Sequence, residues 1–376
     1  MPPPITGAER MQRIAKAQQL MRAAGLKALL VEAGSSLVYF TGVQWWRSER
    51  LTAALIPAEG EPVIVTPEFE EPSVRENLKV AAEVRVWNEH ESPFALLADW
   101  LKAHGAARGP VGVEETTRFF AFDGLRTLGV ETRGDSDVVR ACRVVKSPAE
   151  IALMQAAADI TLAAYRETGP QIARGMTPAD IGSIMSAAMT KHGGTPQFTL
   201  VLLGEASAYP HGTGKPQEVR PGEVVLMDCG CSFEGYQSDI SRTLVMGEAT
   251  KQQRSVWDLV KRGQQIAFET AKVGTPAGAA DDAVRAAYVK AGYGPGYKLP
   301  GTSHRTGHGI GLDVHEPINL VHGETTRLAP GMCFSDEPGI YIPGSFGVRL
   351  EDCVHMTESG PKWFSTPPSS VDAPFG

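Results

Sequence analysis

The first 140 residues alternate between short apolar runs and longer amphipathic stretches. The pattern predicts helices over residues 8–24, 93–105 and 118–127. The segments KALLVE, AALIP, PVIVT, AEVRVW and GPVGVEE have the composition of short strands. Strands that alternate with helices over this length are typical of an α/β domain with a partly parallel sheet. We therefore expect an N-terminal α/β domain over residues 1–143.

Beyond residue 143 the pattern changes to helix, helix, hairpin. Ser147, Pro148 and Glu150 have the spacing of a capping box with proline in the first helical turn, so a long helix is expected to start here. A second helix is expected to start at Thr177-Pro178-Ala179-Asp180 and to end near Lys191. An apolar run that is split by a glycine-containing turn then predicts a β-hairpin over residues 222–246.

The same order of elements then recurs. Thr250 and Gln253 are expected to cap a helix of about 20 residues, a second helix covers residues 277–291, and a hairpin covers 332–355. The two halves are offset by about 103–112 residues, which indicates an internal pseudo-duplication. Symmetric packing of the halves would place both hairpins in one curved antiparallel sheet with helices outside. We expect this α+β architecture over residues 144–376.

Both hairpins contain acidic residues within apolar runs. Such runs normally exclude carboxylates, because an unpaired buried charge costs several kcal/mol. Turns centred on residues 233–234 and on residue 344 would set the two acids of each hairpin directly opposite each other, with Cβ atoms about 4.5–5.5 Å apart. The two pairs are therefore expected to share cations: Asp228 and Asp239 in the first hairpin, Glu337 and Glu351 in the second.

One histidine between the hairpins completes a possible ligand set. His308 lies in the segment HRTGHGIGLDVHEP. Four carboxylates and one imidazole match the needs of two divalent ions, and oxygen-rich ligation with one nitrogen suits Mn²⁺, Fe²⁺, Co²⁺ or Zn²⁺. Two such ions about 3.5–4 Å apart hold a bridging water and lower its pKa, which yields hydroxide at neutral pH. The chain is therefore expected to be a metal-dependent hydrolase.

Composition narrows the cellular setting. The 376 residues carry a formal net charge of −7, which disfavours nucleic acid or an anionic membrane as the main partner. Apolar runs do not approach the roughly 18–20 residues of a membrane span. The N-terminal segment lacks the basic start and apolar stretch of a secretory signal. Five cysteines in a long chain are typical of reduced, buried thiols. We expect a cytoplasmic protein.

Five segments together resemble one known family. YPHGTG, MDCGCSFEGYQSDISRT, HRTGHGIGLDVHEP, SDEPGIYIPG and GVRLED are similar to the signature segments of the creatinase/prolidase/methionine aminopeptidase family, whose catalytic domains have the "pita-bread" fold. The resemblance is greatest to the Xaa-Pro dipeptidase (prolidase) branch. It covers about residues 147–357, and the first 140 residues resemble the creatinase-type N-terminal domain of that branch through weaker motifs.

The resemblance implies a role for each of the five ligand candidates. Asp228 would chelate one ion, His308 and Glu337 would bind the other, and Asp239 and Glu351 would bridge the two. Mn²⁺ is the expected metal, with Zn²⁺ or Co²⁺ as alternatives. Glu337 would also carry a proton from the metal-bound water to the leaving proline nitrogen.

Further residues are expected to contact the substrate. His211 and His315 match the substrate-binding positions of the family and would donate hydrogen bonds to the scissile carbonyl. His304 is a candidate for the pocket wall. Arg349 resembles a family arginine near the substrate, although an ion pair behind the metal ligands is equally compatible with its position.

The segment GVQWWRSER contributes a separate hypothesis. Trp45, Trp46, Arg47 and Arg50 would be placed by a homodimer over the active site of the partner subunit, where they would bind a dipeptide carboxylate. The alternative is a half-buried loop with solvated charges.

The resulting functional prediction is hydrolysis of Xaa-Pro dipeptides. One departure from the family pattern leaves substrate length open: some prolidases have arginine four residues after the second histidine, and this chain has Asn319. Removal of the residue before proline from longer peptides is therefore an alternative, as is a hydrolase or lyase acting on a small zwitterion. A non-catalytic peptide-binding module is disfavoured, since such relatives have lost the metal ligands that this chain retains.

Overall fold

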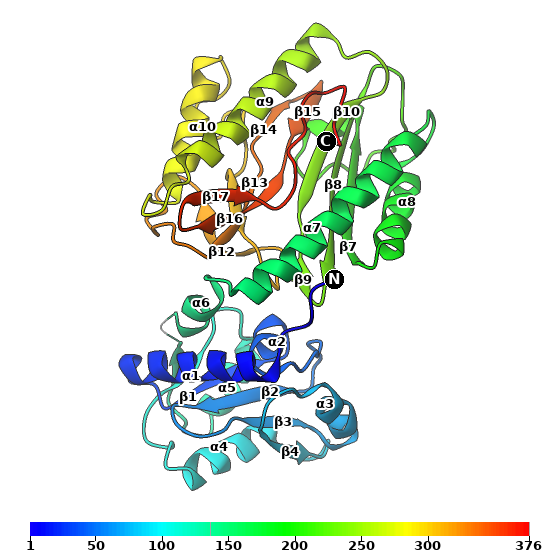
Figure 1. Ribbon diagram of the computed structural model, residues 1–376. Coiled ribbons are helices and arrows are strands. Elements are labelled where there is room, and N and C mark those ends of the chain that lie inside the picture. The colour runs from blue at the N-terminus through cyan, green and yellow to red at the C-terminus, as the bar shows by residue number, and fades with distance from the viewer. Residues whose placement is uncertain (136, 376) are drawn as a thin grey trace. The chain divides into compact units, whose positions relative to one another are not determined.

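The computed structural model describes residues 1–135 and 137–375, and the chain divides into two compact units (Figure 1). One unit comprises Ile5–Arg143. The other comprises Val144–Gly376 together with the first four residues, Met1–Pro4, which the domain boundary expected from the sequence assigns to the N-terminal domain. Among the described residues, none of the helices has the length and apolar character needed to cross a lipid bilayer.

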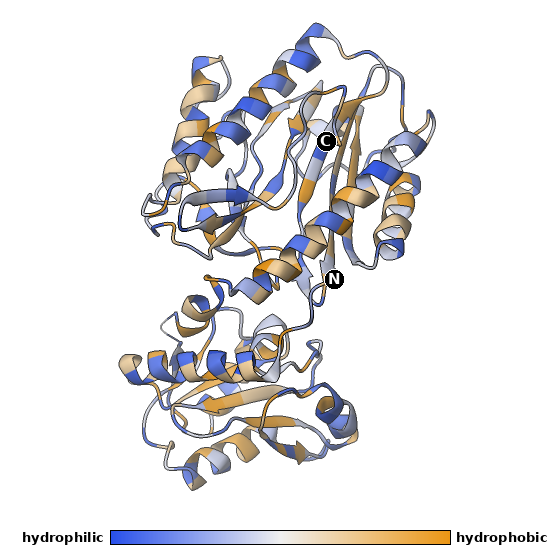
Figure 2. Ribbon diagram, in the orientation of Figure 1, coloured by the Kyte–Doolittle hydropathy of each residue, from blue (hydrophilic) through white to orange (hydrophobic). Residues whose placement is uncertain are grey.

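The N-terminal unit is built on one mixed sheet with strand order β4-β3-β2-β1-β5-β6. Strands β3 and β4 are parallel, as are β1, β5 and β6, whereas β1–β2 and β2–β3 are antiparallel. The partly parallel sheet expected from the sequence is thus confirmed. Figure 2 shows that its central strands are strongly apolar. The strands are β1 (Ala28–Glu32), β2 (Ala53–Pro57), β3 (Val63–Pro67), β4 (Glu83–Trp87), β5 (Val111–Val113) and β6 (Thr132–Gly134).

Helices connect these strands, except for β2 and β3, which a short turn joins. The first is capped at its N-terminus by Thr6, whose hydroxyl accepts a hydrogen bond from the amide of Glu9. Its C-terminal cap is Gly25, which adopts φ 70° in the left-handed region that favours glycine. The helices are α1 (Gly7–Ala24), α2 (Ser35–Thr41), α3 (Glu71–Asn77), α4 (Pro93–Ala103), α5 (Phe119–Arg126) and α6 (Val138–Arg143), with a short 3₁₀ turn, η1 (Glu68–Glu70).

The second unit has two helix pairs, as its sequence repeat predicts. They are α7 (Pro148–Thr168) with α8 (Pro178–Lys191), and α9 (Lys251–Thr270) with α10 (Gly278–Lys290). Three of these four helices start with a reciprocal capping box, in which the N-cap hydroxyl and the side chain three residues later each accept a backbone amide hydrogen bond. The paired residues are Ser147 with Glu150, Thr177 with Asp180, and Thr250 with Gln253.

The strands of this unit form three hydrogen-bonded sheets. The orders are β10-β8-β7 with β9 on β8, β12-β11-β13-β16-β17, and β14-β15. Two 3₁₀ turns, η2 (Gly169–Gln171) and η3 (Gly204–Ala208), complete the unit. The strands are β7 (Thr195–Leu203), β8 (Val224–Phe233), β9 (Tyr236–Gln237), β10 (Ile240–Val245), β11 (Gly307–Gly309), β12 (Glu316–Leu320), β13 (Cys333–Asp336), β14 (Gly339–Ile342), β15 (Phe346–Arg349), β16 (Asp352–Thr357) and β17 (Gly360–Trp363).

The two halves of this unit meet at an isolated bridge between Ser241 and Glu351. The second hairpin is interrupted at Glu337-Pro338, because proline has no amide hydrogen to donate to a ladder. The expected pita-bread architecture is confirmed, but its strands are joined by this bridge rather than by one continuous ladder.

The predicted register is right for the second hairpin. On one side of the interruption Asp336 pairs with Asp352, and on the other side Gly339 pairs with Arg349. Both pairs belong to the register that sets Glu337 opposite Glu351.

The predicted register of the first hairpin is wrong by two residues, since Asp228 pairs with Ser241 and not with Asp239. The turn is centred on Glu234 and Gly235, which have φ values of 49° and 84°. Positive φ angles at both central residues define a type I′ turn, which matches the right-handed twist of hairpin strands. Glycine adopts such angles more readily than other residues. Because the shift is even, Asp228 and Asp239 still occupy the same face.

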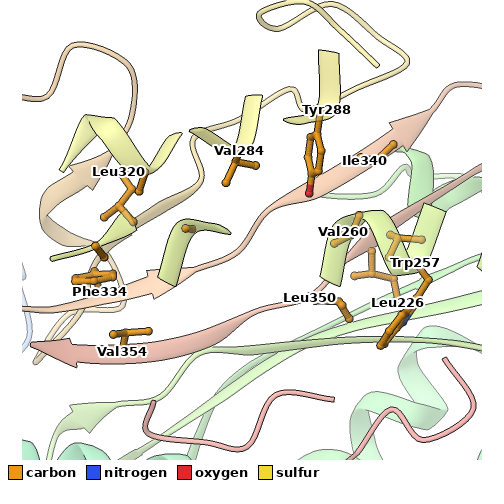
Figure 3. Close-up of a cluster of buried hydrophobic side chains, with 14 of the residues drawn as sticks. Leu226, Trp257, Val260, Val284, Tyr288, Leu320, Phe334, Ile340, Leu350 and Val354 are labelled. Atoms are coloured by element: carbon orange, nitrogen blue, oxygen red, sulfur yellow. The ribbon is translucent and has the colours of Figure 1, made fainter. Parts of the chain in front are cut away.

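Helices α9 and α10 cover the outer face of the sheets in the second half. Figure 3 shows Trp257 and Val260 beside the apolar side chains of Leu226 and Leu350, and all four belong to one buried cluster with Val284. Trp257 is 1 % exposed and donates its indole hydrogen to the carbonyl oxygen of Thr243 at 3.0 Å. A second buried cluster lies between α7, α8 and the first hairpin. These two layers hold the hairpins in place and leave their acidic face toward the interior.

A candidate dinuclear metal centre

The five expected ligands line one cavity of about 680 Å³ in the second unit. They come from elements that are far apart in the sequence. Three of the four carboxylates lie directly before or after a strand, where the chain leaves a regular ladder, and Asp228 lies within one. Asp228 lies in β8, Asp239 directly before β10, His308 in β11, Glu337 directly after β13 and Glu351 directly before β16.

Three of these side chains already approach ligand geometry. Asp239, His308 and Glu351 each offer one atom within 4.8 Å of the others. The Nε2 atom of His308 lies 3.6 Å from Oδ2 of Asp239 and 3.4 Å from Oε1 of Glu337. The opposite ring nitrogen, Nδ1, lies 3.0 Å from the carbonyl oxygen of Gly309. This contact favours a proton on Nδ1 and leaves the Nε2 lone pair directed at the carboxylates.

Two neighbouring side chains hold the carboxylates in position. Nη2 of Arg349 donates to Oδ2 of Asp228 at 2.6 Å, and the Ser241 hydroxyl donates to Oε2 of Glu351 at 2.7 Å. Arg349 also donates from Nε to the Ser241 oxygen at 3.0 Å. One guanidinium therefore orients ligands from both hairpins, directly for Asp228 and through Ser241 for Glu351.

The hydrogen bonding of the other carboxylate oxygens shows whether the site suits a metal. Oδ1 of Asp228, Oδ1 of Asp239 and Oε1 of Glu351 are buried and have no hydrogen-bond partner within the described chain. Buried polar atoms in proteins are almost always satisfied, and an ion is one accepted explanation for an exception. Three unsatisfied anionic oxygens beside an available imidazole nitrogen are the donor set of a hard or borderline divalent cation. The residues fit the metal.

The electrostatics of the site point the same way. Burial, and then the negative charges of Glu351 and Asp228, raise the pKa of Asp239 well above its ordinary value. Burial, and then Glu337, likewise raise the pKa of Glu351. Burial raises the pKa of Glu337 to about 7, although the positive charge of Arg349 opposes this effect. Without cations the cluster therefore retains protons near neutral pH, because adjacent carboxylates repel each other.

The histidine ligand candidate is electrically neutral at physiological pH. Burial, and then the neighbouring charge of His315, lower the pKa of His308 to about 3. The rings of His308 and His315 are in edge contact, with centroids 4.2 Å apart. A neutral imidazole is the form that ligates a metal.

The structure brings the expected substrate residues to the same cavity. His211, His304, His315 and Arg349 all line it, and His211 and His315 are exposed toward solvent. His304 is more constrained: Nε2 lies 2.7 Å from the Tyr341 hydroxyl oxygen, and Nδ1 lies 2.7 Å from the carbonyl oxygen of Arg305. Both ring nitrogens of His304 are thus engaged in the wall, whereas His211 and His315 line the cavity and are accessible from solvent.

The loop with the two tryptophans belongs to the other unit. Arg50 forms ion pairs with Glu49 and Glu89, and Nε of Arg47 donates to the carbonyl oxygen of Ala33 at 3.0 Å. Trp46 is 90 % exposed, and Trp45 is half-buried. The described residues that line the metal cavity lie between 198 and 351, so the loop contributes none of them.

Sequence reasoning missed several contributors to the site. Ser241 carries a visible signal, since it lies two residues after Asp239 and therefore on the same face of its strand. Tyr341 and Arg305 carry weaker signals, because their places in the wall depend on how distant segments pack. The apolar part of the wall was also not predicted: Phe198, Leu200, Tyr297, Val314 and Val321.

Comparisons with known proteins agree with this geometry. Residues 152–358 match the model of metallopeptidase family M24, and residues 13–145 match the creatinase/prolidase N-terminal domain. An Xaa-Pro dipeptidase of Lactobacillus helveticus is 32 % identical over 357 residues, covering 93 % of this chain and 95 % of the relative.

Two solved structures show the same fold over nearly the whole chain. The dipeptidase PepE of Mycobacterium ulcerans has a TM-score of 0.89 at 32 % identity, covering 98 % of both chains. An X-Pro aminopeptidase of Thermotoga maritima has a TM-score of 0.84 at 29 % identity, covering 95 % of this chain and 98 % of the other. With a family match that spans more than half of its residues, this chain belongs to metallopeptidase family M24 and carries a creatinase/prolidase N-terminal domain.

Proposed function

We propose that the protein hydrolyses the peptide bond before proline in Xaa-Pro dipeptides. The observation that carries this proposal is the convergence of four carboxylates and one imidazole on a single cavity. Its support from relatives is the similarity to an Xaa-Pro dipeptidase over 93 % of the chain.

Two divalent ions are the proposed cofactors, with Mn²⁺ as the first candidate and Zn²⁺ or Co²⁺ as alternatives. Asp228 would hold one ion, His308 and Glu337 the other, and Asp239 and Glu351 would contact both. When bound, the ions would polarise the scissile carbonyl and lower the pKa of the attacking water.

Glu337 is the proposed proton carrier. As a carboxylate beside the attacking water, it would accept the proton of that water and pass it on. Cleavage before proline releases a secondary amine, and that nitrogen must gain a proton as the bond breaks. Glu337 lies in the cavity that would hold this bond, and Oε1 of Glu337 is 3.4 Å from Nε2 of His308.

His211 and His315 are the proposed hydrogen-bond donors to the scissile carbonyl. Burial, and then the positive charge of Arg305, lower the pKa of His315, so its imidazole is neutral and donates through a single N–H. Apolar side chains of the wall, including Phe198 and Leu200, would contact the proline ring. Replacing His315 by alanine is expected to lower kcat by about 100-fold, since removal of one such donor typically costs two to three orders of magnitude.

The test is an assay of chelated and metal-reloaded protein. Leu-Pro, Ala-Pro and the tripeptide Leu-Pro-Gly are incubated with chelated protein and then with protein that has received Mn²⁺, Zn²⁺ or Co²⁺. Hydrolysis of the dipeptides only after metal addition, and its absence in the Asp239→Asn variant, are expected. Failure of every reloaded sample to hydrolyse any of the three peptides would show that the proposed function is wrong.

A second candidate is removal of the first residue from longer Xaa-Pro peptides. The observation in its favour is Asn319, which stands where some prolidases carry arginine. The same assay separates the two, because this activity requires Leu-Pro-Gly to be hydrolysed faster than Leu-Pro.

A homodimer in the cytoplasm is the proposed setting. Each of the five cysteines is a buried free thiol, in keeping with a reducing compartment. In such a dimer the loop with Trp45, Trp46, Arg47 and Arg50 would cover the cavity of the partner subunit. Sedimentation measures the oligomeric state. If Arg47→Ala and Arg50→Ala leave KM for Leu-Pro unchanged, the loop has no role in substrate binding.

A further inference from the structure

Among the residues that the structure describes, two arginines line the metal cavity, and their surroundings differ. Arg349 is 3 % exposed in its side chain and donates to Asp228, to Ser241, to the carbonyl oxygen of Pro210 and to the hydroxyl of Tyr341. Its hydrogen-bonding capacity is used by the protein itself. Arg349 is therefore part of the support of the metal ligands.

Arg305 has a different set of contacts. Nη1 of Arg305 donates to Oδ1 of Asn319 at 2.7 Å. Within the part of the chain that the structure describes, no carboxylate oxygen lies within 4.0 Å of Arg305, and this is the one hydrogen bond from its guanidinium. A guanidinium carries five N–H donors in a planar fork that matches a carboxylate. Arg305 thus brings a guanidinium without a direct ion pair among the described residues, and with unused donors, to the cavity.

Asn319 gives this side chain a defined position. In the ladder between β11 and β12, Asn319 lies directly opposite His308, so both side chains are on the same face. The amide oxygen of Asn319 accepts a hydrogen bond from Arg305 but does not neutralise its charge. A carboxylate at this position would hold the guanidinium equally well and would cancel its charge.

We infer that Arg305 binds the C-terminal carboxylate of the dipeptide, with Asn319 as its positioning residue, and that this contact selects for substrate length. The inference rests on the proposed function. It assigns to Arg305 the carboxylate recognition that an arginine at position 319 would otherwise supply. The guanidinium comes from the segment directly before β11 and is held by Asn319 on β12.

The chemistry of the substrate explains the selection. In a dipeptide the carboxylate lies one residue beyond the scissile bond, and consecutive Cα atoms are about 3.8 Å apart. In a tripeptide the same place is taken by a neutral peptide group, which cannot form a charge-assisted pair. Arg305 and His315, the proposed donor to the scissile carbonyl, line the same cavity.

Kinetics with matched substrates test the inference. Leu-Pro, its amide Leu-Pro-NH₂ and Leu-Pro-Gly are compared in metal-loaded wild type and in Arg305→Met. We expect Arg305→Met to lower kcat/KM for Leu-Pro by about 10- to 100-fold, mainly through KM, as for loss of one charge-assisted contact. Hydrolysis of Leu-Pro-NH₂, which has no carboxylate, should change less than about threefold.

Asn319→Asp is the second variant, because it preserves shape and adds only a charge. We expect Asn319→Asp to lower kcat/KM for Leu-Pro as Arg305→Met does. If Asn319 had a purely structural role, this isosteric variant would keep the wild-type kcat/KM. The matched control is Arg220→Met, because Arg220 is exposed and paired with Glu218 in the same unit. This variant should leave kcat/KM unchanged for both Leu-Pro and Leu-Pro-NH₂.

A binding measurement provides a readout independent of turnover. Calorimetric titration of L-proline and of prolinamide into wild-type protein should show tighter binding of proline, and Arg305→Met should remove the difference. If proline and prolinamide bind alike, or if Arg47→Ala or Arg50→Ala rather than Arg305→Met removes the difference, the inference is wrong. Absence of hydrolysis in metal-loaded wild type would instead contradict the proposed function itself.

Discussion

Ser241 and Glu351 join the two hairpins of the catalytic unit at both backbone and side-chain level. Their amides and carbonyls form reciprocal hydrogen bonds of 3.2 and 3.1 Å, and the Ser241 hydroxyl donates to Oε2 of Glu351 at 2.7 Å. The bridge brings a candidate metal ligand of the second hairpin against a strand of the first. Assembly of the metal site and closure of the domain therefore depend on the same contact.

Ser241→Ala is expected to weaken metal binding by about 10- to 100-fold, because the residue orients Glu351 and accepts from Arg349. Leaving these buried groups without their partner should also destabilise the folded state by about 1–3 kcal/mol. Calorimetric titration with Mn²⁺ and thermal unfolding measure the two effects. Ser183→Ala, on the exposed side of α8, is the control and should change neither.

Asp239→Asn is expected to raise the Tm of the chelated protein and to abolish the increase in Tm that metal produces. The reason is that Asp239 lies among Glu351, Asp228 and Glu337, whose charges disfavour its ionised form. The amide removes that repulsion but is a poor ligand. Differential scanning fluorimetry with and without Mn²⁺ measures both effects. A lower Tm in the chelated variant would contradict the interpretation that the cluster is strained by charge.

The stabilisation by metal should increase with pH. In the metal-free protein Glu337 has a pKa of about 7, above its ordinary value of 4.5, so its contribution to stability is present below about pH 4.5 and is lost as pH rises through about 7. Metal requires the deprotonated form and therefore binds more tightly as pH rises through the same range.

Tm measured with and without Mn²⁺ at pH 5.5, 7 and 8 checks this prediction. The difference in Tm is expected to be smallest at pH 5.5 and largest at pH 8. His308 does not titrate in this range, since its pKa is lowered to about 3. A difference that stays constant with pH would show that the carboxylates hold no protons before the metal binds.

Arg242→Leu is expected to destabilise the protein by about 3–5 kcal/mol, since it leaves the Asp352 carboxylate buried and unpaired. Nη2 of Arg242 lies 2.7 Å from Oδ1 of Asp352, and both side chains are fully buried. Adding Asp352→Asn should recover part of the loss by removing the charge. Chemical denaturation measures the free energy of unfolding of both variants. Arg262→Leu is the control, because the ion pair of Arg262 with Glu269 on α9 is exposed and should contribute less than about 1 kcal/mol.

Local sequence signals predicted most elements of the fold. The helix starts at Ser147, Thr177 and Thr250 were predictable because a capping box is formed by residues three positions apart. The register of the second hairpin was also predictable, since Gly344 marks its turn and adopts φ 74°. The first hairpin has Glu234 beside Gly235 in its turn, and glutamate at positive φ carries no sequence signal.

The sequence by itself determined the ligand types and the faces on which they lie, because side-chain alternation along a strand is a property of the backbone alone. Only the tertiary structure decided which cation serves which anion. Arg349 contacts Asp228 across 121 positions of sequence. The tertiary structure likewise placed Arg305, from the segment before β11, against the neutral amide of Asn319 on β12. Such contacts depend on how strands and helices pack against one another, and packing between distant segments has no periodic trace in the order of residues.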